Sequence, residues 1–544
     1  MDADLRLLFP TQSIGCRLFW RLSRALERRG GIGRCGFLVT NRLEFDRFAK
    51  TEGDFDRQAI DLIREWELLA AARAGSPPEP AAIDAWEREI GDPTLWNALI
   101  LDRRLGFPLR AQFVQDYRPA YTHGDLLALL ATALDAIAGQ FDRVRPHAVV
   151  GLNAVTVYDY IYMLIARRRG IPYFQLKLTR IENYVSLYTN PFGISPHIAE
   201  SFARLQAERT LNEAEHTALD QGRHIIARTR DQRLVYEGAV ASDGGRTPSQ
   251  EPVAAQSSLK RVAGLPAEIA RVRAAWALDD PHYPPPLRFT WESRVLKPLR
   301  RRSQRRLFDV ADVTAFAADH AGRYALLPLN TEPEVALLGF GRPFRNQIET
   351  ARLLAAALPV GFTLVVKEHP NSRGYRTASF YRKLAAIPNV RLVPAEAPSG
   401  PLLDGAALVA VVYGTIGLEA LIRRKPVLIL SRPPYDLFPT SMVRYMGDPW
   451  EAPSTIRALL DGHAHDEAAL EAFVAAHIAT GVRANLFTDL LAKPGRQTIS
   501  GVGAIADQYN RLADYTRGRI EDERRRLGAS TEAVGGAEAA QHSP

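Results

Sequence analysis

The chain has 544 residues, of which 46% are apolar and 24% charged, a balance typical of a globular protein with two or three packed cores. Lys and Arg outnumber Asp and Glu by 69 to 61, and the resulting net charge of +8 favours anionic partners such as nucleotides, phosphorylated sugars, nucleic acid or acidic lipid. The two cysteines, Cys16 and Cys35, have no CxxC spacing, so we expect neither a disulfide framework nor a cysteine zinc site.

The amino terminus carries acidic residues where a signal peptide needs a basic region followed by an apolar stretch. No run of about eighteen apolar residues follows. We therefore expect a cytoplasmic protein that associates with the inner face of the cell membrane only peripherally.

The first half of the chain alternates between strand and helix patterns. The sequence predicts strands at LRLLFP (5–10), RCGFLVTN (34–41), HAVVGLNA (147–154) and IPYFQLKL (171–178), with helices between them and a mostly helical insertion over 51–145. A parallel sheet covered by helices is the economical interpretation. We expect residues 1–239 to form one Rossmann-like domain with this helical insertion.

A connector is predicted over 240–320, and its first part, 240–262, is poor in large apolar residues and reads as an exposed excursion. Beyond it, five short apolar runs predict strands at YALLPLN (324–330), FTLVVKE (362–368), VRLVPAE (390–396), LVAVVYG (408–414) and PVLILSR (426–432). They predict a second doubly wound domain over 321–500, followed by a helix over 501–527 and a disordered tail over 528–544.

The first candidate site follows the strand in LVVKEHPNSRG (364–374). Ligands bind at the carboxyl ends of parallel strands, where a His369 imidazole can donate to a phosphate oxygen, Pro370 restricts the backbone and Lys367 adds positive charge. The alternative is a capping histidine beside a surface Lys-Glu pair. The sequence leaves both interpretations open.

The second candidate site lies in VVYGTIGLEALIRRKPVLIL (411–430), where a helix begins directly after a strand. Free N–H groups at a helix start attract anions, Gly414 and Gly417 allow close approach, and the Thr415 hydroxyl adds a donor. Glu419 lies one turn later, where it can accept hydrogen bonds from ribose hydroxyls. The alternative makes Thr415 an N-cap and Glu419 a partner of the helix dipole.

The third candidate site is LLPLNTEPEVALLGFGRPF (326–344), in which Glu332 and Glu334 flank Pro333 after a strand. Paired carboxylates can act as acid, base or hydroxyl acceptors. Two solvated loop acids are an equally good interpretation of this pattern.

Two further patterns carry less weight. GGIGRCG (30–36) contains GxGxxG, but it follows a helix and precedes a strand, the reverse of the dinucleotide fingerprint. The segment 293–308 has seven basic residues and no acid between Arg294 and Arg306, so it can face anionic lipid or an anionic glycan, or be a solvated connector. It lacks the interleaved aromatic residues that nucleic-acid binding needs.

The joint order of P-E, K-E-H-P, G-T-x-G-x-E-A and K-P-V over residues 324–436 resembles bacterial capsule polysaccharide biosynthesis proteins, a group that includes capsular Kdo transferases. The resemblance implies an α/β fold of the GT-B type, with two Rossmann-like doubly wound domains facing a cleft and additional helices. It also implies a glycosyltransferase that uses a nucleotide-activated, possibly CMP-linked, sugar and a capsular or other cell-surface polysaccharide acceptor.

Carried over residue by residue, the resemblance puts His369 and Pro370 at the donor phosphate, Thr415 and Glu419 at phosphate and ribose, and Glu334 near the reacting sugar. The chain departs from the family pattern at Glu332, where Gln is usual, and at Ala336, where Ser or Thr is usual. These departures concern the identity of the donor's sugar and do not touch the nucleotide-binding motifs.

We therefore expect Glu334, His369 and Glu332 to be catalytic. Lys367, His369, Pro370, Gly414, Thr415, Gly417 and Glu419 are expected to hold the nucleotide sugar, which is the co-substrate. No metal, further cofactor or nucleic acid is expected, since helix N–H groups, His369 and Lys367 can stabilise the leaving phosphate. The alternatives are a nucleotide-sugar 2-epimerase of the same fold and a noncatalytic capsule-assembly protein.

Overall fold

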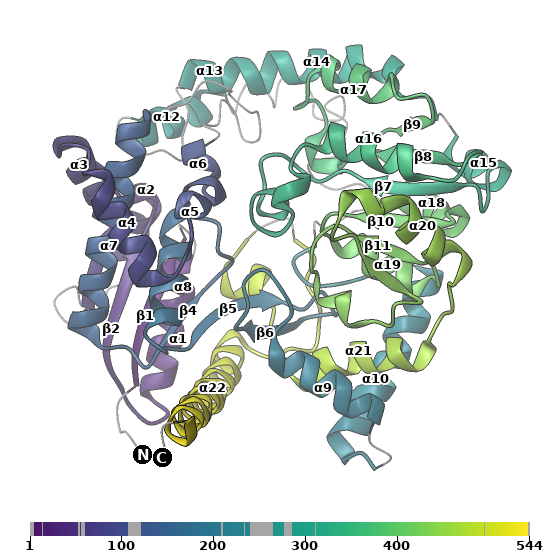
Figure 1. The fold of residues 1–544 in the computed structure, drawn as a ribbon. Coiled ribbons are helices and arrows are strands. Elements are labelled where there is room, and N and C mark those ends of the chain that lie inside the picture. Colours follow the sequence, from purple (N-terminus) through teal and green to yellow (C-terminus); the bar gives the residue numbers. More distant parts are fainter. Residues whose placement is uncertain are drawn as a thin grey trace. The chain divides into compact units, whose positions relative to one another are not determined.

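A computed structural model describes residues 5–12, 15–52, 55, 60–106, 121–207, 210–232, 234–239, 265–276, 286–310, 312–493 and 496–541. The chain divides into two compact units (Figure 1). The first comprises Met1–Gly106, Pro119–Pro191 and Gly481–Pro544, and the second Phe107–Arg118 and Phe192–Thr480.

The first unit is built on a seven-stranded sheet in the order β13-β6-β5-β4-β1-β2-β3. The strands from β3 to β5 run parallel, whereas β6 and β13 join at one edge as antiparallel strands. Both faces of a parallel sheet must be covered, which explains why β1 and β4 are almost wholly apolar and buried. Helix α8 starts at a capping box in which Thr156 and Asp159 exchange hydrogen bonds.

The elements of the first unit are β1 (Leu5–Thr11), α1 (Gly15–Glu27), β2 (Ile32–Val39), α2 (Arg42–Thr51), β3 (Ile60–Arg64), α3 (Glu65–Ala74), α4 (Pro80–Ile90), α5 (Trp96–Leu101), α6 (Arg103–Gly106), α7 (His123–Val144), β4 (Ala148–Gly151), α8 (Val157–Arg168), β5 (Tyr173–Leu178), β6 (Tyr184–Tyr188), β13 (Val482–Arg483), the π-helical turn η8 (Leu486–Leu490) and α22 (Ile505–Gln541).

The second unit is built on a six-stranded parallel sheet in the order β12-β11-β10-β7-β8-β9, with helices on both faces (Figure 1). Its strands are short and rich in Val, Leu and Ile, which suit a sheet buried on both sides. Alternate residues of β7, β8 and β10 pack into one apolar cluster with helices α16 and α20.

The elements of the second unit are α9 (Pro196–Ala207), α10 (Glu213–Asp231), α12 (Leu265–Trp276), α13 (Pro286–Trp291), η1 (Glu292–Leu296), α14 (Lys297–Gln304), η2 (Arg305–Leu307), α15 (Val313–Asp319), β7 (Tyr324–Pro328), η3 (Ala336–Phe340), η4 (Arg342–Phe344), α16 (Gln347–Ala357), β8 (Thr363–Lys367), η5 (Pro370–Ser372), α17 (Ala378–Ala385), β9 (Val390–Val393), α18 (Ser399–Gly405), β10 (Leu408–Val411), α19 (Thr415–Ile422), β11 (Val427–Ile429), η6 (Pro434–Leu437), β12 (Val443–Tyr445), η7 (Pro449–Glu451), α20 (Ala452–Asp461) and α21 (Glu467–Ala479).

These two sheets confirm the prediction of two Rossmann-like doubly wound domains with additional helices. The predicted cleft between them stays a prediction. The division of the chain differs from the predicted boundaries, because residues 192–239 belong with the second unit and residues 481–544 with the first. Part of the 240–320 connector is helical, from α12 to α15, and its predicted exposed excursion at 240–262 lies outside the described residues.

Helix α22 extends to Gln541, past residue 528, where the predicted disordered tail begins. Among the described residues, one helix, α7, is long and apolar enough to cross a membrane by length and composition, although no such run was expected. Half of its most apolar window is buried within the protein, as in the core helix of a soluble domain, so this is weak support for a span.

Candidate functional site

Three loops meet at the carboxyl edge of the second sheet. Strands β10, β7 and β8 are parallel neighbours, so the segments that follow them leave the sheet side by side. The side-chain amide of Asn330, after β7, donates to the carbonyl oxygen of Tyr413, after β10, over 2.7 Å. The Thr331 hydroxyl lies 3.0 Å from Nδ1 of His369, after β8. The structure thus brings together the three segments that carry the predicted site residues.

The imidazole of His369 has a defined orientation. Its Nδ1 accepts a hydrogen bond from the backbone N–H of Asn371 over 3.1 Å, so the side chain caps the short helix η5. An N–H group can only donate, and Nδ1 must therefore carry a lone pair. In the neutral ring the proton then lies on Nε2, which is a hydrogen-bond donor. The capping interpretation is therefore correct for the side chain of His369.

The neighbours of His369 are placed as follows. Pro370 occupies the first position of η5, where its fixed φ and missing N–H are tolerated. Lys367 is the last residue of β8, and its side chain is only 4% exposed. Its carbonyl oxygen accepts from the N–H of Leu329 over 2.9 Å. Glu368 is 3% exposed, so the surface Lys-Glu pair of the alternative interpretation is wrong.

Helix α19 begins directly after β10. Gly414 is its N-cap and has φ +153°, a backbone conformation that L side chains rarely adopt. Thr415 is the first helical residue, so the alternative that made Thr415 the N-cap is wrong. The first N–H groups of a helix have no intrahelical acceptor, and here they begin at the carboxyl edge of the sheet. Thr415 is partly exposed beside them.

Gly417 is required by packing against Tyr435. A Cβ atom at position 417 would lie 2.4 Å from the Tyr435 hydroxyl oxygen, which is closer than side chains approach. That hydroxyl donates to the carbonyl oxygen of Gly414 over 2.8 Å and so steadies the start of α19. We predicted that Gly417 lets a ligand approach; the structure fills this space with a tyrosine ring instead.

Glu419 lies on α19 one turn after Thr415 and is 9% exposed. Side chains four residues apart lie on the same face of a helix. The ribose contact predicted for Glu419 would therefore form on the same face of α19 as Thr415.

Glu334 lies at the start of the π-helical turn η3. Its carbonyl oxygen accepts from the N–H groups of Leu337 and Leu338, each over 3.0 Å, and its side chain is partly exposed. Glu334 is thus anchored through its backbone.

Glu332 has both carboxylate oxygens occupied. Oε1 accepts from Nε2 of Gln347 over 2.5 Å, and Oε2 lies 2.9 Å from Nη1 of Arg376. The carboxylate is thus engaged by the side chains of Gln347 on α16 and of Arg376 in the loop after β8. These contacts fix Glu332 in the loop after β7, and its predicted catalytic role stays a prediction.

Arg376 joins two of the loops. Its Nε lies 3.0 Å from Oε2 of Glu368, and its guanidinium also donates to the carbonyl oxygen of Asn330. Burial alone would lower the pKa of Arg376, but the nearby carboxylates of Glu368 and Glu332 outweigh it and raise this pKa. Glu368 also accepts from the Tyr381 hydroxyl over 2.6 Å. The arginine is therefore a buried, charged link between the loops after β7 and β8.

Sequence reasoning missed Arg376 and Gln347. Arg376 lies in the polar turn after the H-P pair, and nothing in the letters SRGYR marks one arginine as buried. The departure from the family pattern at Glu332 was the available signal, because a new carboxylate in a buried loop needs a cationic partner. No group of three or more His, Cys, Asp or Glu that could hold a metal ion occurs in the described part of the chain.

Comparison with known proteins gives a family match for the region that carries this site. Residues 282–465 match the model of the family described as capsule polysaccharide biosynthesis protein. A search of curated proteins gives no match.

Several solved structures resemble the chain weakly. The β-Kdo 2,7 transferase of Thermosulfurimonas dismutans KpsC has 12% identity, covers 58% of this chain and 74% of its own, and gives a TM-score of 0.30. The β-Kdo 2,4 transferase of the same protein has 15% identity, coverage of 64% and 87%, and a TM-score of 0.30. The UDP-GlcNAc 2-epimerase of Neisseria meningitidis has 10% identity, coverage of 84% and 92%, and a TM-score of 0.21.

Likeness at these TM-scores supports no conclusion about this chain, so the family resemblance depends on the sequence match to residues 282–465. That match covers the strands β7 to β12 and all three loops of the candidate site. The resemblance predicted from residues 324–436 is therefore confirmed, and the segment 282–465 carries the pattern of capsule polysaccharide biosynthesis proteins.

Proposed function

We propose that the chain is a glycosyltransferase of capsule assembly that transfers a sugar from a nucleotide-activated donor, such as a CMP-linked one, to a capsular or other cell-surface polysaccharide. The observation that carries this proposal is the convergence of His369 and the start of α19 at one sheet edge, within the segment that matches the family. Ligands of doubly wound sheets bind at this edge.

The leaving phosphate of the donor would be bound from two sides. The N–H groups at the start of α19 and the Thr415 hydroxyl supply donors from one strand end. The Nε2–H of His369 supplies a donor from another, and its direction is fixed because Nδ1 already accepts from Asn371. Preorganised donors of this kind stabilise negative charge that develops in the transition state. Transfer by these groups needs no divalent metal.

The two carboxylates of the P-E segment take different roles in this proposal. Glu334 is partly exposed at the start of η3 and assists the reacting sugar as an acid, a base or a hydroxyl acceptor. Glu332 is engaged by Arg376 and Gln347 and keeps the loop in place. Glu419 holds the ribose throughout the reaction.

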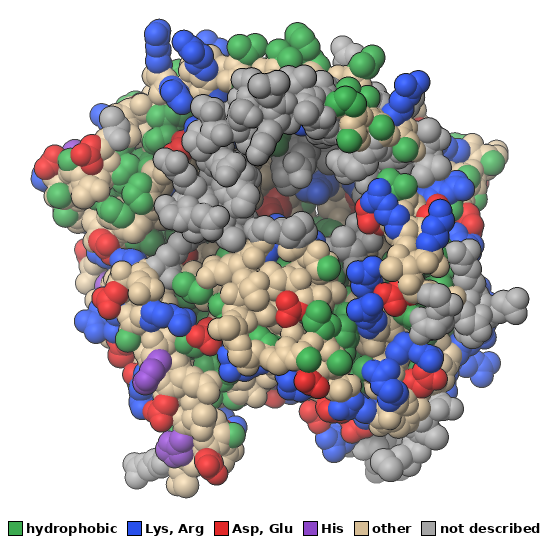
Figure 2. All heavy atoms as spheres, turned by 180° about the vertical axis from the view of Figure 1, so that it is seen from behind, with side chains coloured by type: hydrophobic (Ala, Val, Ile, Leu, Met, Phe, Trp, Pro, Cys, Tyr) green, Lys and Arg blue, Asp and Glu red, His purple; other side chains and the backbone are tan. Residues whose placement is uncertain are grey.

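In this proposal the chain binds its acceptor at the inner face of the cell membrane. From Pro286 to Gln304 the chain is continuously helical, and the side chains of Leu287, Trp291 and Leu299 are 82%, 56% and 59% exposed. Apolar and basic side chains adjoin along the upper rim of Figure 2, the side on which α13 and α14 lie in Figure 1. The acid of this stretch, Glu292, is buried and lies 3.6 Å from Arg300. Exposed Trp and Leu beside arginines suit the interface of an anionic membrane.

Acceptor dependence tests the proposal. The purified chain is incubated with a panel of nucleotide sugars, with and without lipid-linked glycan acceptors, and released nucleotide and sugar products are measured. A glycosyltransferase releases nucleotide and extends the glycan only when both substrates are present. A 2-epimerase would convert the donor sugar without an acceptor, and an assembly protein would consume no donor. Either result would overturn the proposal.

Measuring donor affinity and turnover together distinguishes the role of Glu419 from that of Glu334. Glu419→Gln should chiefly weaken nucleotide binding, because this contact holds in the ground state and the transition state alike. Glu334→Gln should lower turnover with nucleotide affinity little changed. Equal losses of affinity in the two variants would contradict this division of roles.

A further inference from the structure

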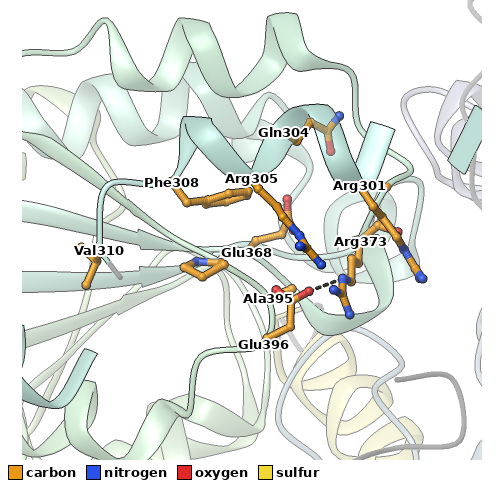
Figure 3. Close-up of a pocket in the computed structure, with 11 residues that line it drawn as sticks. Arg301, Gln304, Arg305, Phe308, Val310, Glu368, Arg373, Ala395 and Glu396 are labelled. Atoms are coloured by element: carbon orange, nitrogen blue, oxygen red, sulfur yellow. Dashed lines mark hydrogen bonds and ion pairs between the residues drawn. The ribbon is translucent and has the colours of Figure 1, made fainter. Parts of the chain in front are cut away.

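A cavity lies at the same sheet edge, on the side of β9, and the proposed transfer reaction does not use it. Its volume is about 370 Å³. Its walls come from α14 and η2, from the loops after β8 and β9, and from the segment before α15 (Figure 3). The lining residues are Arg301, Gln304, Arg305, Phe308, Val310, Glu368, Arg373, Gly374, Pro394, Ala395 and Glu396.

Positive charge exceeds negative charge in this cavity. Arg373 forms an ion pair with Glu396. The carboxylate of Glu368 pairs with Arg376 and accepts a hydrogen bond from the Tyr381 hydroxyl. No carboxylate of the described residues lies within ion-pair distance of Arg301 or Arg305. In Figure 3, Arg305 and Arg373 extend toward Glu396, with Arg301 beside them. Arg301 and Arg305 thus have no carboxylate of their own at ion-pair distance, and the nearest acid acting on Arg301, Glu396, is already paired with Arg373.

The pKa shifts of the basic residues at the cavity agree with this excess of positive charge. Burial, together with the positive charge of Arg373, lowers the pKa of Arg301. Burial and the charges of Arg301 and Arg373 lower the pKa of the neighbouring Lys297 to about 7. Such crowding of like charges is unfavourable without an anion to offset it.

The cavity wall is held firmly in place. Gly374 has φ +77°, and a Cβ atom there would lie 2.7 Å from Cγ of Arg301 and 2.8 Å from the carbonyl oxygen of Lys297. Nε2 of Gln304 donates to the carbonyl oxygen of Arg376 over 2.6 Å, and Nζ of Lys297 donates to the Tyr375 hydroxyl over 2.5 Å. Helix α14 is thus fastened to the loop after β8, and the arginines are preorganised for a ligand.

Part of the cavity wall is apolar. Phe308 packs against Tyr381 with 5.0 Å between the ring centroids, and Val310 and Ala395 are buried. Small-molecule sites of this size, about 300 to 1,000 Å³, combine apolar walls with a few convergent polar groups. Here the convergent groups are guanidinium ions, which pair with phosphate through two parallel hydrogen bonds.

We propose that this cavity binds a phosphate monoester carried on a small organic body, at a site separate from the donor phosphate position at His369 and Thr415. The phosphate lies between Arg301 and Arg305, and the organic body lies against Phe308, Val310 and Ala395. A sugar phosphate and a mononucleotide share this chemistry. The proposal does not depend on the transfer reaction, since it concerns binding alone.

Calorimetric titration of the full chain tests it, with glucose 6-phosphate, cytidine 5′-monophosphate and inorganic phosphate as probes. At least one of the two monoesters should bind more tightly than inorganic phosphate. Arg301→Gln and Arg305→Gln should each weaken this binding roughly tenfold or more, because hydrogen bonds to charged groups are lost. Arg305 is exposed, so its variant should keep the fold. Arg302→Gln, an exposed position on the same helix that does not line the cavity, should bind as the unmodified chain does.

Three results would overturn the proposal. One is the absence of monoester binding beyond that of inorganic phosphate. Another is an equal loss of binding in the Arg302→Gln control. The third is monoester binding that His369→Ala abolishes and Arg301→Gln leaves intact, which would place the ligand at the donor site. Glycosyl transfer can fail without affecting any of these measurements, so this test and that of the proposed function fail separately.

Discussion

The Thr331 hydroxyl and Nδ1 of His369 lie 3.0 Å apart, and this contact joins the loop after β7 to the loop after β8. Together with the N–H of Asn371, it directs the imidazole through one nitrogen and leaves the other as a donor.

His369→Ala should reduce turnover by about 10² to 10³-fold, because one preorganised donor to the leaving phosphate is lost. His369→Asn is the matched control, because asparagine can still cap η5 but has no donor at the position of Nε2. We expect the cap to be worth about 1 kcal/mol of stability, so the Asn variant should melt above the Ala variant while both turn over slowly. Recovery of turnover in the Asn variant would show that capping alone matters.

Arg376→Ala should destabilise the second unit by about 3 to 5 kcal/mol, because it leaves the carboxylates of Glu332 and Glu368 in place without their cation. Chemical denaturation of the full chain measures this loss. Arg382→Ala is the control, since Arg382 is exposed on the neighbouring helix α17, and its effect should stay within about 0.5 kcal/mol. Similar midpoints for the two variants would contradict a buried ionic link.

Gly417→Ala should destabilise the protein by about 1 to 3 kcal/mol, because the new methyl group displaces the Tyr435 ring and its bond to Gly414. The same change at Gly518, inside α22 with no atom within 4 Å of a new Cβ, should instead raise stability by about 0.5 to 1 kcal/mol. Tyr435→Ala should cost less in the Gly417→Ala background than alone. Additive losses would mean that the two residues do not interact.

Acid should weaken the fold through His477. This histidine is buried in α21, its Nδ1 lies 2.9 Å from the carbonyl oxygen of Phe473, and burial lowers its pKa to about 4. Between pH 6.5 and 4 the unfolded chain binds a proton that the folded chain does not. Stability therefore falls as the pH falls, by roughly 3 kcal/mol in total.

Unfolding measured at several pH values should show a shallower acid slope in His477→Leu than in the unmodified chain. His224→Gln, an exposed position on α10, should leave the slope unchanged. If His477→Leu loses stability in acid as steeply as the unmodified chain, the buried imidazole is not the cause.

The helical stretch Pro286–Gln304 should bind anionic vesicles. Trp291→Glu should weaken sedimentation with vesicles of anionic lipid by roughly tenfold or more, because the burial of a large apolar side chain is lost. Trp450→Glu is the control, as Trp450 is 92% exposed on η7, outside this stretch. Binding should decrease at high salt. Equal binding of both variants, or no preference for anionic lipid at low salt, would remove the membrane from the proposal.

The strands of both sheets could be predicted wherever a run of large apolar residues marks them. All five predicted strands of the second unit are present, from β7 to β11. The sequence did not predict four strands, β3, β6, β12 and β13. The IDLIR run of β3 is interrupted by an acid, and β13 is a two-residue strand defined only by its pairing with β6. Strand pairing of this kind depends on the tertiary fold and leaves little trace in local composition.

The candidate site, like the strands, could be predicted only where a local sequence pattern marks it. The order of strands at the sheet edge follows from parallel topology, so three motifs after three strands could be expected to meet. The link between Glu332 and Arg376 spans 44 residues, and the contact between Gly417 and Tyr435 depends on a turn beyond the next strand. These pairings arise from packing, and a single sequence does not encode them in a local pattern.

The return of the chain to its first unit bears on the order in which the protein can fold during synthesis. Strand β13 completes the edge of the first sheet, and the Tyr515 hydroxyl of α22 lies 2.9 Å from the hydroxyl of Ser186 on β6. Both elements leave the ribosome after the whole of the second unit. The first sheet therefore stays incomplete, with the outer edge of β6 unpaired, while nearly three hundred further residues are translated. An open strand edge is a place where chains pair wrongly with one another, so the addition of β13 is also the step that protects the nascent protein from aggregation at this edge.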